Sequence, residues 1–194
     1  MSQWTTETAE WYARNYGDYP IGRIAVAAIV LASSDVVVDV GCGTGSALRH
    51  AASYVTDGIL IGVDPVPRMI EIAQEQTRRH PAATRIEFRL GSAEALPLAA
   101  ASTDVVFAFD SIDHWQDQAR GLAEIRRILR QDGQLIVTKD RSVPGAGKAA
   151  RQFTASIVQA GFLVTRQRTI TESDVVFSLW ECSLASASPP EPAQ

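Results

Sequence analysis

The sequence has few of the residue types that build disulfide frameworks, metal sites or membrane spans. Among its 194 residues are two cysteines, Cys42 and Cys182, and three scattered histidines. Two cysteines cannot form a disulfide framework, and none of these residues has the paired spacing of metal ligands. The longest apolar run, residues 24–32, has about half the length of a membrane helix. A metal site and a membrane span are therefore not expected.

Basic residues are also fewer than acidic ones. Eighteen basic residues against 22 acidic ones give a formal charge of −4 and a pI near 5.4. The chain thus lacks the basic field that drives non-specific nucleic-acid binding, and a nucleic-acid partner is not expected. The first residues include Trp4, Glu7 and Glu10 rather than a basic stretch followed by an apolar one, so a cytoplasmic location is expected.

What the chain does have is the composition and length of one globular domain. Apolar residues make up 46% and charged residues 21% of a 21.0 kDa chain, which are ordinary values for a globular protein. We expect a single domain over residues 1–185, in which residues 1–32 form N-terminal helices. Residues 186–194, with three prolines, are expected to form a disordered tail.

Short β-branched runs alternate with amphipathic segments along most of the chain. The first run, residues 36–40, is followed by a glycine, as expected for a buried parallel strand. Residues 65–79 and 117–130 place apolar side chains at helical spacing. Such alternation predicts an α/β fold, a doubly wound and mostly parallel sheet with helices on both faces. Further strands are predicted at residues 59–63, 86–90, 104–109 and 134–138, with a turn at Asp132-Gly133 before the last of them.

The C-terminal part of the chain departs from this alternation. After a predicted helix near residues 147–160, the strand-like segments 162–169 and 175–184 follow with no helix between them. Their short connection, residues 170–174, can join only an antiparallel pair. The sheet is therefore expected to have seven strands and to end in an antiparallel hairpin.

The most informative stretch follows the first predicted strand and reads Asp39-Val40-Gly41-Cys42-Gly43-Thr44-Gly45. Glycines there let the backbone turn sharply and approach a ligand, and the helix that follows presents free N–H groups. Asp64, at the end of the next strand, lies 23 residues past Gly41. A carboxylate at that position can accept hydrogen bonds from both hydroxyls of a ribose.

Two classes of ligand use this architecture. A dinucleotide fingerprint needs glycine at its first, third and sixth positions, and the sixth position here is Ser46. The chain also has no Tyr-x-x-x-Lys pair, since its only lysines are Lys139 and Lys148, so a nicotinamide dehydrogenase is disfavoured. The spacing instead resembles the S-adenosylmethionine loop of class I methyltransferases.

The resemblance to class I methyltransferases extends over roughly residues 33–140. Segments similar to the later motifs of that family follow in order at Leu60–Asp64, Val66–Met69, Leu90–Pro97, Thr103–Phe107 with His114-Trp115, and Glu124–Gly133. The resemblance implies a Rossmann-like fold, S-adenosyl-L-methionine as cofactor and no metal. It assigns cofactor binding to Asp39, Gly41, Cys42, Gly43, Gly45, Asp64, Met69, Ser92, Ala93, Glu94, Phe109 and Tyr16.

Departures from the family pattern bear on the acceptor of the methyl group. Residues 109–115 lack the Asn/Asp-Pro-Pro-Tyr/Phe motif of members that methylate planar amino groups, and no Pro-Cys pair supplies a nucleophile for base methylation. Cys42 is interpreted as a small residue that permits close packing. Only residues 141–148 separate the fifth strand from the next helix, so the chain has no room for a substrate domain there. A small-molecule acceptor is therefore expected.

Asp110 and His114 are the candidate catalytic residues after the fourth strand. Methyl transfer from a sulfonium is an in-line displacement that requires positioning and exclusion of water, and a base only for a nucleophile with a proton of high pKa. His114 suits that role by its intrinsic pKa, and packing of the following helix is the alternative. Asp110 could face the methionine amine, face the acceptor, or cap a helix.

The N-terminal segment concentrates aromatic residues. Tyr12 and Tyr16 are four residues apart on a helix predicted at residues 5–16, which Tyr19-Pro20 separates from another at residues 21–32. In similar methyltransferases this segment folds over the cofactor as a lid, and packing against the sheet is the alternative. We therefore predict a small-molecule methyltransferase, with a non-catalytic cofactor-binding partner subunit as the alternative; the oligomeric state, a homodimer included, stays open.

Overall fold

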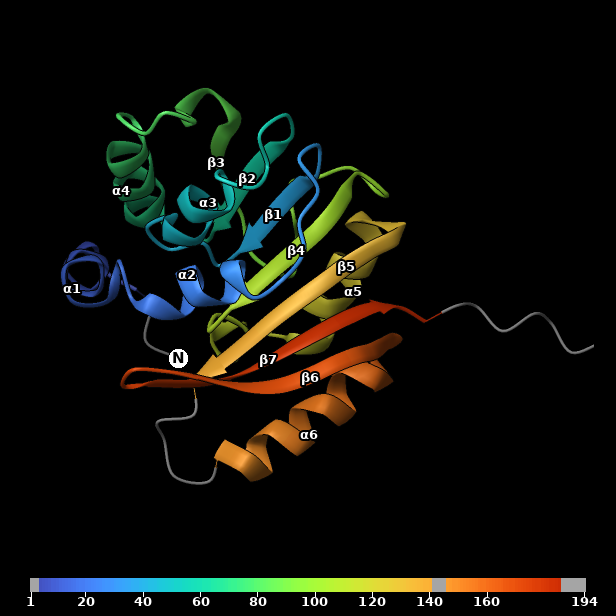
Figure 1. The fold of residues 1–194 in the computed structure, drawn as a ribbon. Helices are drawn as coiled ribbons and strands as arrows, with labels where there is room; N and C mark the ends of the chain where they lie inside the picture. Colours follow the sequence, from blue (N-terminus) through green and yellow to red (C-terminus); the bar gives the residue numbers. More distant parts are fainter. Residues whose placement is uncertain (1–3, 141–145, 186–194) are drawn as a thin grey trace, which may run out of the picture.

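Residues 4–140 and 146–185 are described by the structure, a computed structural model (Figure 1). They contain one sheet with the strand order β3-β2-β1-β4-β5-β7-β6. The first five strands run parallel, and β7 lies antiparallel between β5 and β6. The strands are β1 (Val36–Val40), β2 (Ile59–Asp64), β3 (Ile86–Leu90), β4 (Thr103–Phe109), β5 (Leu129–Asp140), β6 (Phe162–Glu172) and β7 (Val175–Leu184). The predicted fold class is confirmed.

Helices cover both faces of this sheet. In Figure 1, α2 and α3 lie on one face, and α5 and α6 lie on the other. The α-helices are α1 (Thr6–Tyr16), α2 (Pro20–Ala27), α3 (Ser46–Ala51), α4 (Pro67–Thr77), α5 (Gln118–Ile128) and α6 (Ala146–Gln159), with short 3-10 turns η1 (Ala83–Arg85) and η2 (Ile112–His114). None of the described helices is long and apolar enough to cross a membrane.

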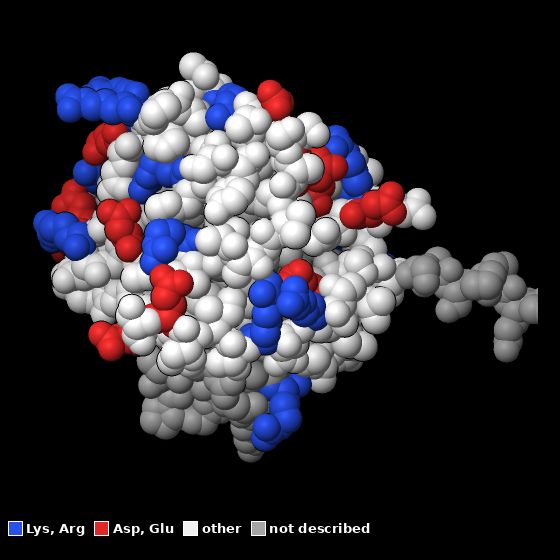
Figure 2. All heavy atoms as spheres, viewed as in Figure 1, with Lys and Arg blue, Asp and Glu red and all other residues white. Residues whose placement is uncertain are grey.

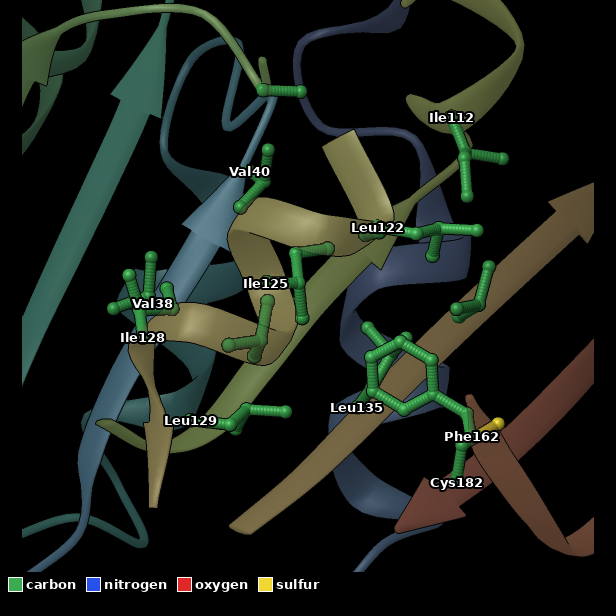
Figure 3. Close-up of a cluster of buried hydrophobic side chains, with 14 of the residues drawn as sticks. Val38, Val40, Ile112, Leu122, Ile125, Ile128, Leu129, Leu135, Phe162 and Cys182 are labelled. Atoms are coloured by element: carbon green, nitrogen blue, oxygen red, sulfur yellow. The ribbon is translucent and has the colours of Figure 1, made fainter. Parts of the chain in front are cut away.

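The core consists of two layers because successive strand residues point to opposite faces of the sheet. Val38 of β1 belongs to the cluster beneath α5, where Leu122, Ile125 and Ile128 pack against the sheet (Figure 3). Its neighbour Val37 belongs to the other cluster, which contains the buried residues of α2 and α3. Strands buried on both faces explain the nearly continuous apolar runs in the sequence.

Surface charges of both signs are interspersed on the face that Figure 2 shows. Several of the described charges are paired, as in the contact of 2.8 Å between the Arg68 guanidinium and the Glu71 carboxylate. Mixed and paired charges do not produce an extended field of one sign over this face.

Three predicted boundaries are wrong: the end of the second helix, the connection before the last strand, and the turn near the start of β5. The helix expected at residues 21–32 ends at Ala27. Residues 28–35 then lead back to the start of β1, and the Ala32 N–H donates to the Asp35 carboxylate. The connection expected at residues 170–174 shrinks to Ser173-Asp174, because backbone pairing continues to Glu172 and Val175. Tertiary pairing thus determines where these elements end.

The turn expected at Asp132-Gly133 is also placed differently. Helix α5 ends at Ile128, and β5 starts at Leu129. The register with β4 shifts between the pairs Thr103–Leu129 and Val105–Gln134, so the two turn residues lie in a bulge within β5. The tail predicted at residues 186–194 lies outside the described residues.

Candidate functional site

The glycine loop joins β1 to α3 at the carboxyl edge of the sheet. Because β1 lies between β2 and β4, this edge is the point where the strand order reverses and where ligands of such sheets bind. The N–H groups of Gly41 and Cys42 donate to the Val63 carbonyl at 2.8 and 3.2 Å. These two hydrogen bonds hold the loop against the end of β2.

Each glycine of the loop has a left-handed backbone, but their surroundings differ. The φ angles are +79° at Gly41, +51° at Gly43 and +76° at Gly45. A Cβ atom at Gly45 would lie 2.6 Å from ring carbons of Phe88, whereas a Cβ atom at Gly43 would meet only Tyr12, at 4.0 Å. Gly45 therefore permits close packing, and Gly43 leaves open space in which a ligand can approach the backbone.

Asp64 links the loop to the end of β2. One carboxylate oxygen accepts the Gly43 N–H at 3.0 Å, and the other accepts the Val66 N–H at 2.9 Å. Burial raises the pKa of Asp64, and the two hydrogen bonds oppose that shift. Each oxygen keeps a second lone pair, so the carboxylate can also accept hydrogen bonds from two ribose hydroxyls.

Two cavities adjoin at this loop. The first has a volume of about 160 Å³ and extends toward α4 and the segment after β3, and the second, of about 470 Å³, extends toward α1 and α2. The indole N–H of Trp115, in the wall of the first cavity, is buried without a hydrogen-bond partner in the described part of the chain. The residues common to both cavities are Tyr12, Gly41, Gly43, Phe109, Asp110 and His114.

Nearly all of the residues predicted from the sequence line these cavities. The first contains Gly41, Gly43, Asp64, Met69, Ser92, Ala93, Glu94 and Phe109, with both catalytic candidates, Asp110 and His114. The second adds Asp39, Cys42 and Tyr16. Gly45 lines neither cavity. Their roles in binding and catalysis remain predictions.

Several other lining residues were not among the cofactor-binding and catalytic residues predicted from the sequence. Tyr12, Tyr19 and Asp140 line the second cavity, and Val66 and Gln116 line the first. The aromatic concentration of the N-terminal segment was the available signal for the two tyrosines. No sequence signal identified Gln116, because its position depends on how η2 and the following turn cross the sheet edge.

Asp39 and Cys42 are buried ionisable groups on the second cavity. Burial, with a smaller contribution from nearby Asp64, raises the pKa of Asp39 to about 7. No donor among residues 4–140 and 146–185 hydrogen-bonds to the Asp39 carboxylate. Burial also raises the pKa of the Cys42 thiol, whose Sγ lies 2.7 Å from the position of a Cβ at Gly62. This close contact fits the interpretation of Cys42 as a packing residue.

Asp110 has the most unusual conformation in the site. It is a non-glycine residue with φ at +47°, and its carboxylate accepts the Asp140 N–H at 2.7 Å. That bond reaches the end of β5, so the proposed helix-capping role is wrong. Burial raises the pKa of Asp110 to about 6, with Asp140 and Asp113 adding to the rise. Strained residues with shifted pKa values gather at functional sites.

Aromatic residues of the N-terminal segment line both cavities. The ring centroids of Tyr12 and Tyr16 are 5.5 Å apart, and those of Tyr16 and Tyr19 are 6.1 Å apart. Trp4 contacts the ring edges of Tyr12 and His114. The Thr44 hydroxyl donates to the Gly17 carbonyl at 2.6 Å and ties this segment to the glycine loop. The segment therefore lies where a lid would close.

Other candidates lie away from the cavities or belong to no cluster. The Arg23 guanidinium lies outside both cavities and pairs with Glu172 at 2.8 Å. Within the described ranges, no group of three or more His, Cys, Asp or Glu side chains is placed to hold a metal ion.

Comparison with known proteins decides the family. A sequence profile described as "Methyltransferase domain" matches residues 38–137, more than half of the chain. The chain belongs to this methyltransferase family. Residues 38–137 include the glycine loop, Asp64 and Asp110. The resemblance to class I S-adenosylmethionine-dependent methyltransferases is thereby confirmed, and S-adenosylmethionine is the cofactor of that class.

Relatives of this methyltransferase differ in the atom they methylate. A ubiquinone/menaquinone biosynthesis C-methyltransferase of Geotalea uraniireducens is 36% identical over 116 residues, which are 59% of this chain and 49% of that protein. An O-methyltransferase of Penicillium expansum is 30% identical over 123 residues, 62% of this chain and 44% of that protein. The chain thus spans about half the length of the curated relatives it matches.

A solved structure confirms the fold over nearly the whole methyltransferase. The S-adenosylmethionine-dependent methyltransferase of Aquifex aeolicus aligns with a TM-score of 0.77 at 15% identity. The alignment covers 94% of this chain and 100% of the other.

Replacing Gly45 by alanine is expected to lower the free energy of unfolding by about 2–4 kcal/mol, because the methyl group meets the partly buried Phe88 ring in a strained backbone. Gly43→Ala is the matched control. This variant has the same backbone strain, but its methyl group enters open space, so a loss of about 1 kcal/mol in the free energy of unfolding is expected. Urea unfolding measures both losses, and equal losses would contradict the packing role of Gly45.

The stability of the cofactor-free methyltransferase is expected to fall as pH rises from about 4 to about 7. The pKa of Asp39 is about 7 in the folded chain against 3.8 for an ordinary aspartate, so over this range the folded chain holds a proton that the unfolded chain has released. Asp39→Asn is therefore expected to be more stable than the parent at pH 8 by about 1–3 kcal/mol and equally stable near pH 4. Urea titrations at both pH values measure the difference in stability between Asp39→Asn and the parent protein, and a difference independent of pH would contradict the prediction.

Proposed function

We propose that this chain transfers a methyl group from S-adenosylmethionine to a small-molecule acceptor. The proposal rests on the junction of the two cavities at Gly43, where the cavity beside Asp64 and a second, aromatic-lined cavity share one wall. When bound, S-adenosylmethionine supplies an electrophilic methyl group on a positively charged sulfur. The chain's own residues then have to bind, orient and shield the two reactants.

The first cavity suits the nucleoside. Asp64 offers free lone pairs for two ribose hydroxyls, and Met69, 2% exposed, provides an apolar wall. Ser92, Ala93 and Glu94 line the same cavity and would face the adenine edge. The Trp115 indole N–H, buried without a partner in the described chain, is a further donor beside this cavity. These features together fit the cofactor that the family uses.

Asp39 suits the ammonium group of the methionine end. Its carboxylate lies 3% exposed in the wall of the second cavity and accepts no hydrogen bond from the described residues. An ammonium group beside it would stabilise the charged form and lower its pKa again. The open face of Gly43 would allow the cofactor to pass between Asp64 and Asp39.

The remainder of the second cavity suits the acceptor. The whole second cavity has a volume of about 470 Å³, which lies in the range of small-molecule sites, and the methionine end of the cofactor would occupy the part beside Asp39. Asp110 lines both cavities and has a pKa of about 6, so at neutral pH it is ionised and can take a proton from the attacking group. His114 is exposed at the rim against Trp4, which favours a positioning role for it. A cytoplasmic location stays a prediction, and the oligomeric state stays open.

Titration calorimetry with S-adenosylmethionine and its demethylated product tests cofactor binding. We expect affinity on the order of micromolar, and at least a tenfold loss in Asp64→Ala because the ribose loses its acceptor. Asp57→Ala, at an exposed position outside both cavities, is the matched control and should leave the affinity unchanged. Absence of heat with both ligands would contradict the proposal.

A transfer assay separates the enzyme from a non-catalytic binding subunit. The enzyme is expected to move a labelled methyl group from the cofactor to a low-molecular-weight compound of a cell extract. Cofactor binding without any transfer would favour the binding subunit.

A further inference from the structure

The second cavity is richer in carboxylates than in basic groups. Asp39, Asp110 and Asp140 line it, whereas no lysine or arginine of the described residues does. Lys139, the neighbour of Asp140 in sequence, directs its ammonium group to the Asp113 carboxylate at 2.7 Å and over the Phe153 ring at 4.7 Å. With Asp39 assigned to the cofactor ammonium, Asp110 and Asp140 remain beside the acceptor space, and of these two Asp110 also lines the first cavity.

Tyr12 and Tyr19 line the second cavity together with Asp110. Burial raises the pKa of both phenols, the negative charge of Asp110 adds to the rise at Tyr12, and the charges of Asp140 and then Asp110 add to it at Tyr19. Tyr16 lies between these two rings, with centroid distances of 5.5 and 6.1 Å. A carboxylate beside aromatic faces attracts organic cations, through ion pairing and through the electron-rich ring faces.

Anionic acceptors suit this space poorly. A carboxylate or phosphate placed beside Asp110 would meet a like charge in a partly desolvated cavity, and no described basic side chain lines the wall to compensate it. An uncharged alcohol could donate a hydrogen bond to Asp110 but would bring no positive charge. A cationic group is therefore the better complement to the field at this position.

We propose that the acceptor is an amine that binds as an ammonium ion, pairing with Asp110 while Tyr12, Tyr16 and Tyr19 contact its carbon skeleton. This inference rests on the proposed function, since it places the acceptor in the second cavity. It names a substrate class that differs from the carbon and oxygen acceptors in the names of the two relatives.

The transfer needs only Asp110, the amine and the methyl donor S-adenosylmethionine. The bound ammonium gives one proton to the Asp110 carboxylate, which leaves a neutral amine with a free lone pair. That lone pair forms the new C–N bond as the bond from the methyl carbon to sulfur breaks, and the sulfur keeps the electron pair of that bond. The product is a methylated ammonium ion, and Asp110 releases its proton to solvent.

Binding to the complex with the demethylated cofactor tests the inference without turnover. The probes are 2-phenylethylamine, 2-phenylethanol and phenylacetate, which share one ring and differ in the charge of the end group. Calorimetry at pH 7.5 is expected to show the amine binding at least tenfold more tightly than the alcohol, and phenylacetate more weakly than either. Equal or tighter binding of the alcohol or the acid, or no binding of the amine, would overturn the inference.

Two variants locate the charge that selects the amine. Asparagine tolerates the positive φ of Asp110, so Asp110→Asn is expected to fold and to remove the preference for the amine. Asp113 is an exposed neighbour outside both cavities, and Asp113→Asn is expected to keep that preference. A preference that survives Asp110→Asn would contradict the assignment. Failure to bind the demethylated cofactor refutes the proposed function, whereas cofactor binding without amine preference refutes only this inference.

Discussion

The hydrogen bond from the Gly43 N–H to the Asp64 carboxylate, 3.0 Å long, connects the ends of β1 and β2 and shapes the site around it. It requires the left-handed backbone of the glycine loop and a carboxylate at the end of the second strand. Together with the two hydrogen bonds to the Val63 carbonyl, it holds the loop against the end of β2. The backbone of Gly43 is then open toward the cavities, because no side chain stands in front of it. Both cavities depend on this arrangement.

Burial of carboxylates around this loop is unfavourable for the empty protein. Asp39 and Asp110 both have raised pKa values, because water is excluded and negative neighbours are close. Such groups reduce stability at neutral pH unless a positive partner arrives. A cofactor that carries an ammonium and a sulfonium, and an acceptor that carries an ammonium, would compensate these charges. Stability and ligand binding are therefore coupled through the same aspartates.

The sequence predicted the sheet well because parallel strands buried on both faces leave continuous apolar runs. It also placed Asp39, Asp64 and Asp110 at one edge, since the carboxyl ends of parallel strands meet there. It assigned Gly45 to cofactor binding and could not show that this residue packs against the Phe88 ring, which lies 43 residues further along the chain. Nor could it place Tyr12 and Tyr19 in one cavity with Asp110, because that depends on how α1 and α2 pack against the sheet edge.

A crystal structure of this chain with the demethylated cofactor bound would show directly which groups hold the cofactor. We predict ribose hydroxyls within about 3 Å of the Asp64 carboxylate, the amino group beside Asp39, and the sulfur facing the space next to Asp110. A nucleoside bound away from Asp64, or a sulfur directed away from Asp110, would contradict this prediction.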